Sequence, residues 1–371
     1  MTILKRSVLD AIGHVPTICL NQISTLCHTQ ELYLKLESCN PGGSIKEKNA
    51  VFLIELAEDN KLLKPGGTII ESSSGNFGIS IAMVAAQKGY KSLIVVDAKT
   101  SDSSKLMMQA YGAQLVEVPL SAIDENGSMQ KARIEKAKEL ERQISNSWYP
   151  LQHFNPDNPT AHIKYTASEI IKDFNGPPDV IVLGVSTSGQ LTGIGSFFKK
   201  HYPKTKIIAV DVAGSVVFGG RAHPYKMVGV GLSFVPPQFN VNLIDKAYYV
   251  NDVLAFSVCR ELALKEGLLL GGSTGAIVAA GLSYAQTLNK KQKTLMINPD
   301  RGDRYLFTIY NDTWLKEQNL TLLKGAELYK AMHSLTPVSQ QILHQKGSTN
   351  EVDHHSKNDH TVEGIHSSFH Q

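Results

Sequence analysis

Short apolar runs rich in β-branched residues alternate with longer amphipathic or alanine-rich stretches along most of the chain. Such alternation indicates βαβ units, in which helices cover a parallel sheet. In the first half of the chain it predicts strands at 67–71, 91–97 and 113–118, followed in turn by helices at 76–88, 103–111 and 129–145.

A second series of the same kind begins with the apolar run DVIVLGV at 179–185. The segment HFNPDNP at 153–159 separates the two series and is interpreted as a crossing loop. Two α/β units would place an active site between them, where the carboxyl ends of strands face helix N-termini. The second series continues with a helix at 190–201, a strand at 206–212, helices at 252–266 and 274–288, and a strand at 294–298.

Length and charge narrow the possibilities. The chain has 371 residues, more than the roughly 250–300 at which a single core usually stops growing, so two domains are expected. With 37 Lys and Arg against 34 Asp and Glu, its formal charge is +3. No basic stripe interleaved with aromatic residues indicates nucleic acid, so a small-molecule partner is expected.

The cysteines and the apolar runs bear on cellular location. Four cysteines, Cys19, Cys27, Cys39 and Cys259, lack paired zinc-ligand spacing and a small-domain disulfide pattern, and Cys259 is expected to be buried in a helix. There is no uncharged apolar run of about 18 residues and no signal-peptide core at the start. We therefore expect a cytoplasmic protein with reduced thiols that does not enter a membrane.

The first chemical candidate is a lysine. The turn-rich segment NPGGSI at 40–45 leads into a predicted helix that begins near Lys46. A lysine there is either a solvated residue of the first turn or a side chain aimed into a site. Taken alone, the solvated interpretation is the commoner one, but the segments that follow favour the second.

Three further turns combine small hydroxyl residues with glycine, and each precedes a predicted helix. Free backbone N–H groups and the helix dipole at such turns suit a carboxylate or a phosphate. The simple alternative is a helix cap with nothing bound, yet one cap residue normally suffices and the first two turns carry several. The turns are SSSGNFG at 72–78, STSGQLTG at 186–193 and GGSTG at 271–275.

Two familiar phosphate-binding motifs are missing. The turn at 186–193 does not follow G-x-G-x-x-G, Gly229-Val-Gly231 has no third glycine at the right offset, and no G-x-x-x-x-G-K-[ST] occurs. A nicotinamide dehydrogenase and a P-loop enzyme are therefore disfavoured. One lysine, two anion-binding turns and a third hydroxyl turn instead provide what a cofactor bound as a Schiff base requires: an amine, a phosphate site, a carboxylate site and a partner for a ring nitrogen.

Taken together, these segments resemble the fold-type II pyridoxal-phosphate (PLP) enzymes, the family of cysteine synthase and cystathionine β-synthase. The resemblance covers about residues 8–315 and implies two doubly wound α/β domains of the tryptophan synthase β-like class, with pyridoxal 5′-phosphate as cofactor. GSVVFGG and PDRGDRYL are similar to the subgroup of N-(2-amino-2-carboxyethyl)-L-glutamate synthases of siderophore (2,3-diaminopropionate) biosynthesis. The segments that carry the resemblance are NPGGSIK, SSSGN, VSTSG, AVDVAGSVVFGG, GGSTGA and PDRGDRYL.

The resemblance implies a role for each matching residue. Lys46 would bind the cofactor covalently and serve as the catalytic base, and Ser273 would face the pyridine nitrogen. A neutral hydroxyl there makes the ring a weaker electron sink than a carboxylate would, which favours loss of a β-substituent over transamination. The cofactor would also be bound by Asn76, Ser186, Thr187, Ser188, Gly189 and Gln190, and the substrate by Ser73, Ser74, Gly75, Phe77, Arg133 and His153.

Several positions depart from the family pattern or admit a simpler interpretation. Glu47-Lys48 stands where cysteine synthases usually have Asp-Arg, so altered helix contacts are expected. His153 stands where the siderophore enzymes have an aromatic hydroxyl and cysteine synthases a glutamine. Arg133 lies on a charged helix. Its interpretation as a solvated cation is as well supported as a role in binding an anionic substrate. Asp300 and Arg301 follow a predicted strand and are expected to form a structural ion pair.

The resemblance also implies a domain division and a homodimer. Residues 40–152 would form a smaller mobile domain that binds the substrate carboxylate, and residues 1–39 with 153–321 a larger domain that binds the cofactor phosphate. Beyond 322 the pattern decays into a C-terminal extension, whose end at 347–371 is polar, rich in histidine and expected to be disordered. The histidine spacing matches no specific metal site.

Three functions remain open. The leading expectation is a PLP-dependent β-replacement that joins O-phospho-L-serine to L-glutamate. The alternative, cysteine synthesis from O-acetylserine or O-phosphoserine and sulfide, would use the same catalytic residues. The third possibility is a non-catalytic protein that binds partners through this fold. Such a protein would be expected to have lost the lysine or asparagine motif, whereas Lys46 and Asn76 stand in intact motifs.

Overall fold

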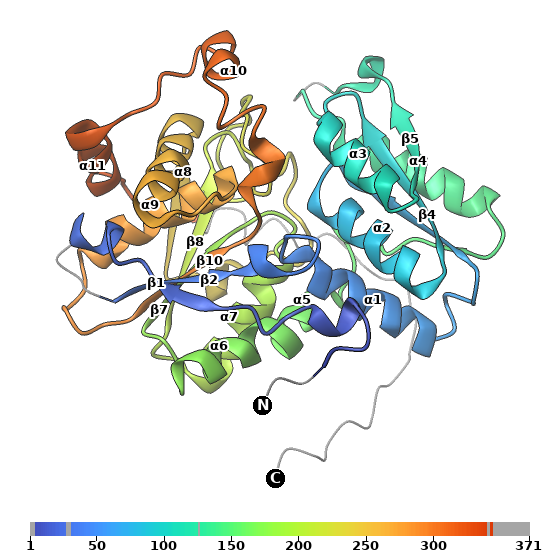
Figure 1. The fold of residues 1–371 in the computed structure, drawn as a ribbon, viewed down its shortest axis with the longest axis horizontal. Helices are drawn as coiled ribbons and strands as arrows, with labels where there is room; N and C mark the ends of the chain where they lie inside the picture. The colour runs from blue at the N-terminus through green and yellow to red at the C-terminus, as the bar shows by residue number, and fades with distance from the viewer. Residues whose placement is uncertain (1–3, 27–30, 125–126, 340–341, 344–371) are drawn as a thin grey trace.

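The computed structural model describes residues 4–26, 31–124, 127–339 and 342–343, and its strands form two sheets (Figure 1). One sheet has six strands in the order β1-β2-β10-β7-β8-β9, in which only the β1–β2 pair is antiparallel. The other has four parallel strands in the order β5-β4-β3-β6. The mixed α/β class with parallel sheets is therefore confirmed.

The four-stranded sheet is covered on both faces because its strands alternate their apolar side chains. Ile69 and Ile94 pack into one apolar cluster with α1, α2 and α3, while Ile70 and Leu93 pack with α4 on the opposite face. The elements are β3 Thr68–Ser72, β4 Lys91–Asp97, β5 Gln114–Val118, β6 Ser147–Trp148, α1 Lys46–Asp59, α2 Asn76–Lys88, α3 Asp102–Ala110 and α4 Gln130–Gln143.

The six-stranded sheet follows the same rule. Val180 and Val182 pack with α8 and α9, whereas Ile181 and Leu183 pack with α6 and α7. Helix α9 is buried along its whole length, as expected of a helix that is apolar all round. The elements are β1 Thr17–Cys19, β2 Leu32–Leu36, β7 Val180–Gly184, β8 Lys206–Val212, β9 Lys246–Val250, β10 Thr294–Asn298, α5 Asn158–Ala161, η5 His162–Ala167, α6 Ser168–Phe174, α7 Gly189–His201, α8 Asp252–Glu266, α9 Gly272–Ala285, α10 Asp312–Glu317 and α11 Gly325–His333.

Short 3-10 turns complete the described elements, and η5 is a turn of π-helix. In the part of the chain that the structure describes, no helix is long and apolar enough to cross a membrane. The 3-10 turns are η1 Leu9–Ala11, η2 Ile23–Leu26, η3 Glu37–Cys39, η4 Leu120–Ala122, η6 Val241–Leu243 and η7 Gly302–Tyr305.

Every strand and helix predicted in the two series is present to within a few residues, but three details were wrong or missing. The predicted crossing loop 153–159 already contains the start of α5 at Asn158. Strands β1, β2, β6 and β9 were not predicted. The pattern beyond 322 includes α11, whose Leu328 and Met332 are buried against the core of α8 and α9. The histidine-rich stretch 347–371 lies outside the described residues.

Candidate active site

A cavity of about 240 Å³ lies between the two sheets, at the carboxyl ends of their parallel strands. Strand β3 ends at Ser72 and β7 at Gly184, and each is followed by a loop that lines the cavity and opens a helix. A third lining segment runs from Tyr225 to Leu232. The cavity brings together Lys46, Ser73, Ser74, Gly75, Asn76, Phe77, Arg133, His153, Ser186, Thr187, Ser188 and Gln190.

Lys46 is the first residue of α1 and lies in the cavity wall. The turn before it is closed by Glu47, whose carboxylate accepts hydrogen bonds from the backbone N–H groups of Gly42 and Ser44 at 2.8 and 2.9 Å. Burial lowers the pKa of Lys46 from its ordinary 10.5 to about 8. Its Nζ forms no ion pair or hydrogen bond within the described residues, so this amine is available to a bound molecule.

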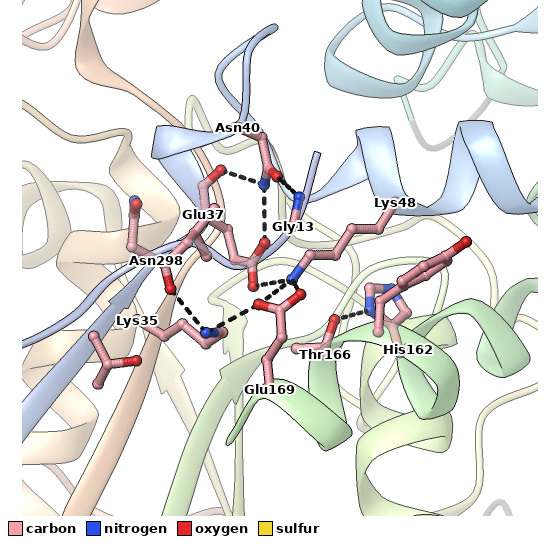
Figure 2. A network of polar contacts seen from close by, with 12 residues as sticks. Gly13, Lys35, Glu37, Asn40, Lys48, His162, Thr166, Glu169 and Asn298 are labelled. Atoms are coloured by element: carbon pink, nitrogen blue, oxygen red, sulfur yellow. Dashed lines mark hydrogen bonds and ion pairs between the residues drawn. The ribbon is translucent and has the colours of Figure 1, made fainter. Parts of the chain in front are cut away.

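The helix that carries Lys46 is fixed by a network of buried charges, shown in Figure 2. Lys48 lies 2.7 Å from Glu37 and 3.0 Å from Glu169, and all three side chains are buried. Asn40 extends the network, donating to Glu37 at 2.9 Å and accepting from the N–H of Gly13 at 2.8 Å. The Glu47-Lys48 pair therefore makes inward contacts, with the loop before α1 and with the elements beneath the helix.

The loop after β3 supplies a helix N-terminus. The Ser73 hydroxyl, two residues before the N-cap Gly75, accepts from the N–H of Gly78 at 2.9 Å and so caps the first turn of α2. Phe77 lines the cavity but is 2% exposed and belongs to the core of this sheet. Ser74 and Gly75 remain half-buried at the cavity, next to the first turn of α2, whose N–H groups have no acceptor within the helix.

Asn76 joins this loop to the segment that follows β10. Its Nδ2 donates to Asp300 at 2.7 Å, the Tyr305 hydroxyl donates to the same carboxylate oxygen at 2.6 Å, and Arg304 donates to the Asn76 carbonyl oxygen. The expected ion pair between Asp300 and Arg301 is wrong, because Arg301 pairs with Asp303 at 3.4 Å and the Asp300 side chain points inward to Asn76.

The loop after β7 has the geometry of an anion site. Ser188 adopts a left-handed φ of 65°, uncommon for a non-glycine residue and enriched at functional sites. Its hydroxyl and the Gln190 Nε2 are buried without a hydrogen-bond partner among the described residues. Both lie at the N-terminus of α7, where backbone dipoles favour negative charge.

Gly189 and Ser273 stand behind the cavity wall and do not line it directly. A Cβ on Gly189 would lie 2.5 Å from Oδ1 of Asn158, so this position must be glycine for the loop to pack. A Cβ on Gly229, which does line the cavity, would lie 3.3 Å from the Ser273 hydroxyl. That hydroxyl is buried and has no partner within the described part of the chain.

Arg133 is a buried residue, and its interpretation as a solvated cation is wrong. Its side chain is 5% exposed, and its Nε lies 3.1 Å from Asp97. Its Nη1 is buried with no hydrogen-bond partner among the described residues, at the wall of the cavity that contains Lys46. A cation held in this way is suited to an anionic ligand.

His153 lies in the same cavity and is neutral. Burial, with the nearby cations Arg133 and Lys46, lowers the pKa of its imidazole to about 3. Its Nδ1 is buried without a hydrogen-bond partner in the described residues, and its ring packs against Phe234 at 5.8 Å between centroids. The imidazole can therefore donate or accept a hydrogen bond, but it carries no charge near neutral pH.

Comparison with known proteins decides the family. The model of the family described as "Pyridoxal-phosphate dependent enzyme" matches residues 8–300. The chain belongs to this family.

Two named relatives align with most of this chain. The chain is 36% identical over 312 residues to "N-(2-amino-2-carboxyethyl)-L-glutamate synthase" of Cupriavidus metallidurans, a match that covers 83% of this chain and 91% of the relative. It is 39% identical over 321 residues to "Cystathionine beta-synthase" of Apis mellifera, covering 85% of this chain but only 63% of that longer protein. The chain thus spans less than two thirds of the Apis relative.

A solved structure agrees with the family. The structure of the O-acetylserine dependent cystathionine beta-synthase from Helicobacter pylori matches the PLP enzyme with a TM-score of 0.77 and 35% sequence identity. This match covers 84% of this chain and the whole of that chain. At this similarity the fold-type II architecture is shared.

The unpartnered groups of the cavity fit pyridoxal phosphate. Within the part of the chain that the structure describes, an unpaired lysine amine lies in its wall, and buried donors without partners stand at Ser188 and Gln190, where a phosphate would bind the α7 N-terminus. The Ser273 hydroxyl, which has no partner among the described residues, lies next to Gly229 of the cavity wall and could serve a ring nitrogen. Amine, phosphate donors and hydroxyl are therefore all available.

Some lining residues were missed by sequence reasoning. Gln130, Gln152 and Tyr225 line the cavity. Glu71, near the end of β3, was also missed, and burial raises the pKa of its carboxyl group to about 8. The one sequence signal for this wall of the cavity was Gly229-Val-Gly231, which was considered only as an incomplete dinucleotide-binding motif. Both glycines have left-handed φ angles, 93° and 81°, and carry the loop along the cavity.

Proposed function

We propose that the enzyme joins O-phospho-L-serine to L-glutamate, giving N-(2-amino-2-carboxyethyl)-L-glutamate and phosphate. In this β-replacement the Cβ–O bond of phosphoserine breaks, and phosphate leaves with the electron pair. The glutamate nitrogen forms the new bond to Cβ and loses a proton. The observation that carries the choice of substrate is the buried Arg133, whose Nη1 has no partner among the described residues and could receive a phosphate ester in the cavity of Lys46.

Different groups of residues would bind the cofactor and the substrate. Pyridoxal phosphate, when bound, supplies an electron-withdrawing ring that stabilises negative charge at the substrate Cα. Ser186, Thr187, Ser188, Gly189 and Gln190 would hold its phosphate, and Asn76 and Ser273 its ring.

Lys46 would bind the cofactor and, once free, take the proton from Cα. A pKa of about 8 leaves about one amine in ten neutral at pH 7, compared with fewer than about one in a thousand for an ordinary lysine. Ser73, Ser74, Gly75 and Phe77, at the N-terminus of α2, would orient the substrate carboxylate.

A mobile smaller domain would protect the reaction from water. We propose the division into residues 40–152 and residues 1–39 with 153–321, because the cavity lies where the two sheets meet. Movement of the α2 loop towards the α7 loop would exclude the water that competes with the amine. A cytoplasmic location and a homodimer are part of this proposal.

Cysteine synthesis from O-acetylserine or O-phosphoserine and sulfide is the second candidate. Its use of O-acetylserine is supported by the likeness to the Helicobacter pylori cystathionine beta-synthase, whose name specifies that substrate. Lys46 and both anion-binding loops would serve this reaction equally well. The two candidates differ only in the leaving group and the nucleophile.

Product analysis separates the candidates. The PLP-loaded protein is incubated with O-phospho-L-serine and, separately, with O-acetyl-L-serine, each alone, with L-glutamate and with sulfide. Phosphate release and product mass are followed. Glutamate-dependent release with a product of the adduct mass supports the first candidate. Cysteine formation without a glutamate adduct supports the second, and turnover with neither nucleophile contradicts both. The Lys46→Ala variant is the control for release that does not depend on the site.

A further inference from the structure

A second, larger cavity adjoins the one that contains Lys46. Its volume is about 580 Å³, and it shares Ser74, Asn76 and Arg133 with the inner cavity. Its outer wall is formed by the residues that follow β4 and by the loop around Lys226. We call it the outer chamber. A nucleophile entering from solvent through it would meet Arg133 and Asn76 at the junction with the inner cavity.

The described residues that line the outer chamber have an excess of positive charge. Their cations are Lys99, Arg133, Lys226 and Arg304, and their one carboxylate, Asp97, is paired with Arg133 at 3.1 Å. This distribution favours an anionic ligand over a neutral or cationic one.

Lys99 and Lys226 are the accessible cations. Both side chains are exposed, and neither is in an ion pair within the described residues, although Asp252 accepts from the backbone N–H of Lys226 at 2.7 Å. The Lys99 ammonium donates to the Gly127 carbonyl at 2.7 Å, a neutral acceptor that leaves its charge in place. Thr100 and Ser128 add hydroxyl groups to the lining.

Size provides a second, independent argument. Sulfide is only somewhat larger than a water molecule, whose share of liquid volume is roughly 30 Å³, so a chamber of about 580 Å³ far exceeds what it needs. An amino acid with a side-chain carboxylate would fill more of this volume and match its charge.

We propose that the outer chamber binds the second substrate and selects a dicarboxylic amino acid, with Lys99 and Lys226 receiving its carboxylates. The proposal rests on the proposed replacement at phosphoserine and adds the residues that choose the nucleophile. The amine of the bound amino acid then faces the junction at Arg133.

Steady-state kinetics of variants that remove one positive charge test the assignment of Lys99 and Lys226 to the second substrate. Lys99→Met and Lys226→Met each raise the KM for L-glutamate about threefold, as expected for loss of one partly exposed charge pair, and the double variant raises it about tenfold. The KM for O-phosphoserine changes less than twofold, and Lys99→Arg retains the wild-type value for glutamate. Lys91, exposed at the opposite end of β4, supplies the matched control Lys91→Met. Variants that behave like this control overturn the proposal.

A second measurement separates failure of this proposal from failure of the proposed function. If wild-type protein forms no glutamate adduct, the proposed function is wrong, and the chamber is then tested by inhibition of sulfide-dependent turnover. Glutarate, which has both carboxylates of glutamate and no amine, is compared with the monocarboxylate pentanoate. The proposal predicts stronger inhibition by glutarate, weakened in the Lys99 and Lys226 variants. Equal inhibition by the two acids overturns it.

Discussion

The Nζ atom of Lys48 lies 2.7 Å from Oε1 of Glu37, and neither side chain is exposed to solvent. Glu37 follows β2 in the six-stranded sheet, whereas Lys48 stands in the first turn of α1, two residues after Lys46. Glu169 of α6 completes the contact at 3.0 Å (Figure 2). The pair therefore holds the helix that begins at Lys46 against the larger sheet.

Removing the Lys48 charge will destabilise the fold strongly. In Lys48→Met, Glu37 and Glu169 lose a buried partner, so we expect the free energy of unfolding to fall by about 3–5 kcal/mol. The matched control is Lys88→Met, which breaks a pair of the same length with Glu58 at a partly exposed site and is expected to lose about 1 kcal/mol or less. Urea unfolding of both apoproteins measures the difference, and equal losses would show that burial of the Lys48 pair has no consequence.

Covalent uptake of the cofactor will become nearly independent of pH above about pH 9, one unit above the pKa of Lys46. Burial lowers the pKa of Lys46 to about 8, and only the neutral amine attacks an aldehyde. The rate for the apoprotein, followed by visible absorbance, is therefore expected to rise from pH 6, to reach half its maximum near pH 8 and to level off by about pH 9. A rate that continues to rise towards pH 10 would mean that Lys46 titrates as an ordinary lysine.

Arg133 will affect binding of the phosphate ester. Arg133→Lys keeps a charge but loses the forked donor geometry, so we expect the KM for O-phospho-L-serine to rise about tenfold, equivalent to about 1.4 kcal/mol. The same helix offers Arg142→Lys as a control, because Arg142 is exposed near the end of α4. An unchanged KM in Arg133→Lys would restrict Arg133 to its structural contact with Asp97.

His153 will contribute to the loss of stability in acid. Its pKa is about 3 in the folded protein and about 6.5 in the unfolded chain, so between these pH values only the unfolded chain binds the proton. The free energy of unfolding therefore falls as pH falls from 6.5 towards 3, by up to about 1.4 kcal/mol per pH unit. His153→Phe is expected to show a shallower decline in urea unfolding between pH 6.5 and pH 4. Parallel curves for variant and wild type would mean that His153 is protonated in the folded protein.

The features predicted from sequence depend on local signals. Lys46 and the serine-rich segment before Asn76 were predicted to be functional because each belongs to a turn that leads directly into a helix. The six predicted parallel strands each read as a short apolar run, and all except the partly exposed edge strand β5 are largely buried. The two-residue strand β6 and the edge strand β1 are too short to give such a signal.

What the sequence did not predict depends on residues far apart in the chain. Asp97 lies 36 positions before Arg133, so nothing near Arg133 indicated that its helix turns this cation inward. Asp300 was paired with its neighbour Arg301 because adjacency was the only information available. In the folded chain it accepts from Asn76, a residue 224 positions away.

The most direct test of the account is to locate the lysine that holds the cofactor. Protein loaded with pyridoxal phosphate is reduced with borohydride and digested, and the labelled peptide is identified by mass spectrometry. The account predicts the label on Lys46, with the Lys46→Ala variant unlabelled and inactive towards O-phospho-L-serine. A label on another lysine, or turnover by the variant, would contradict it.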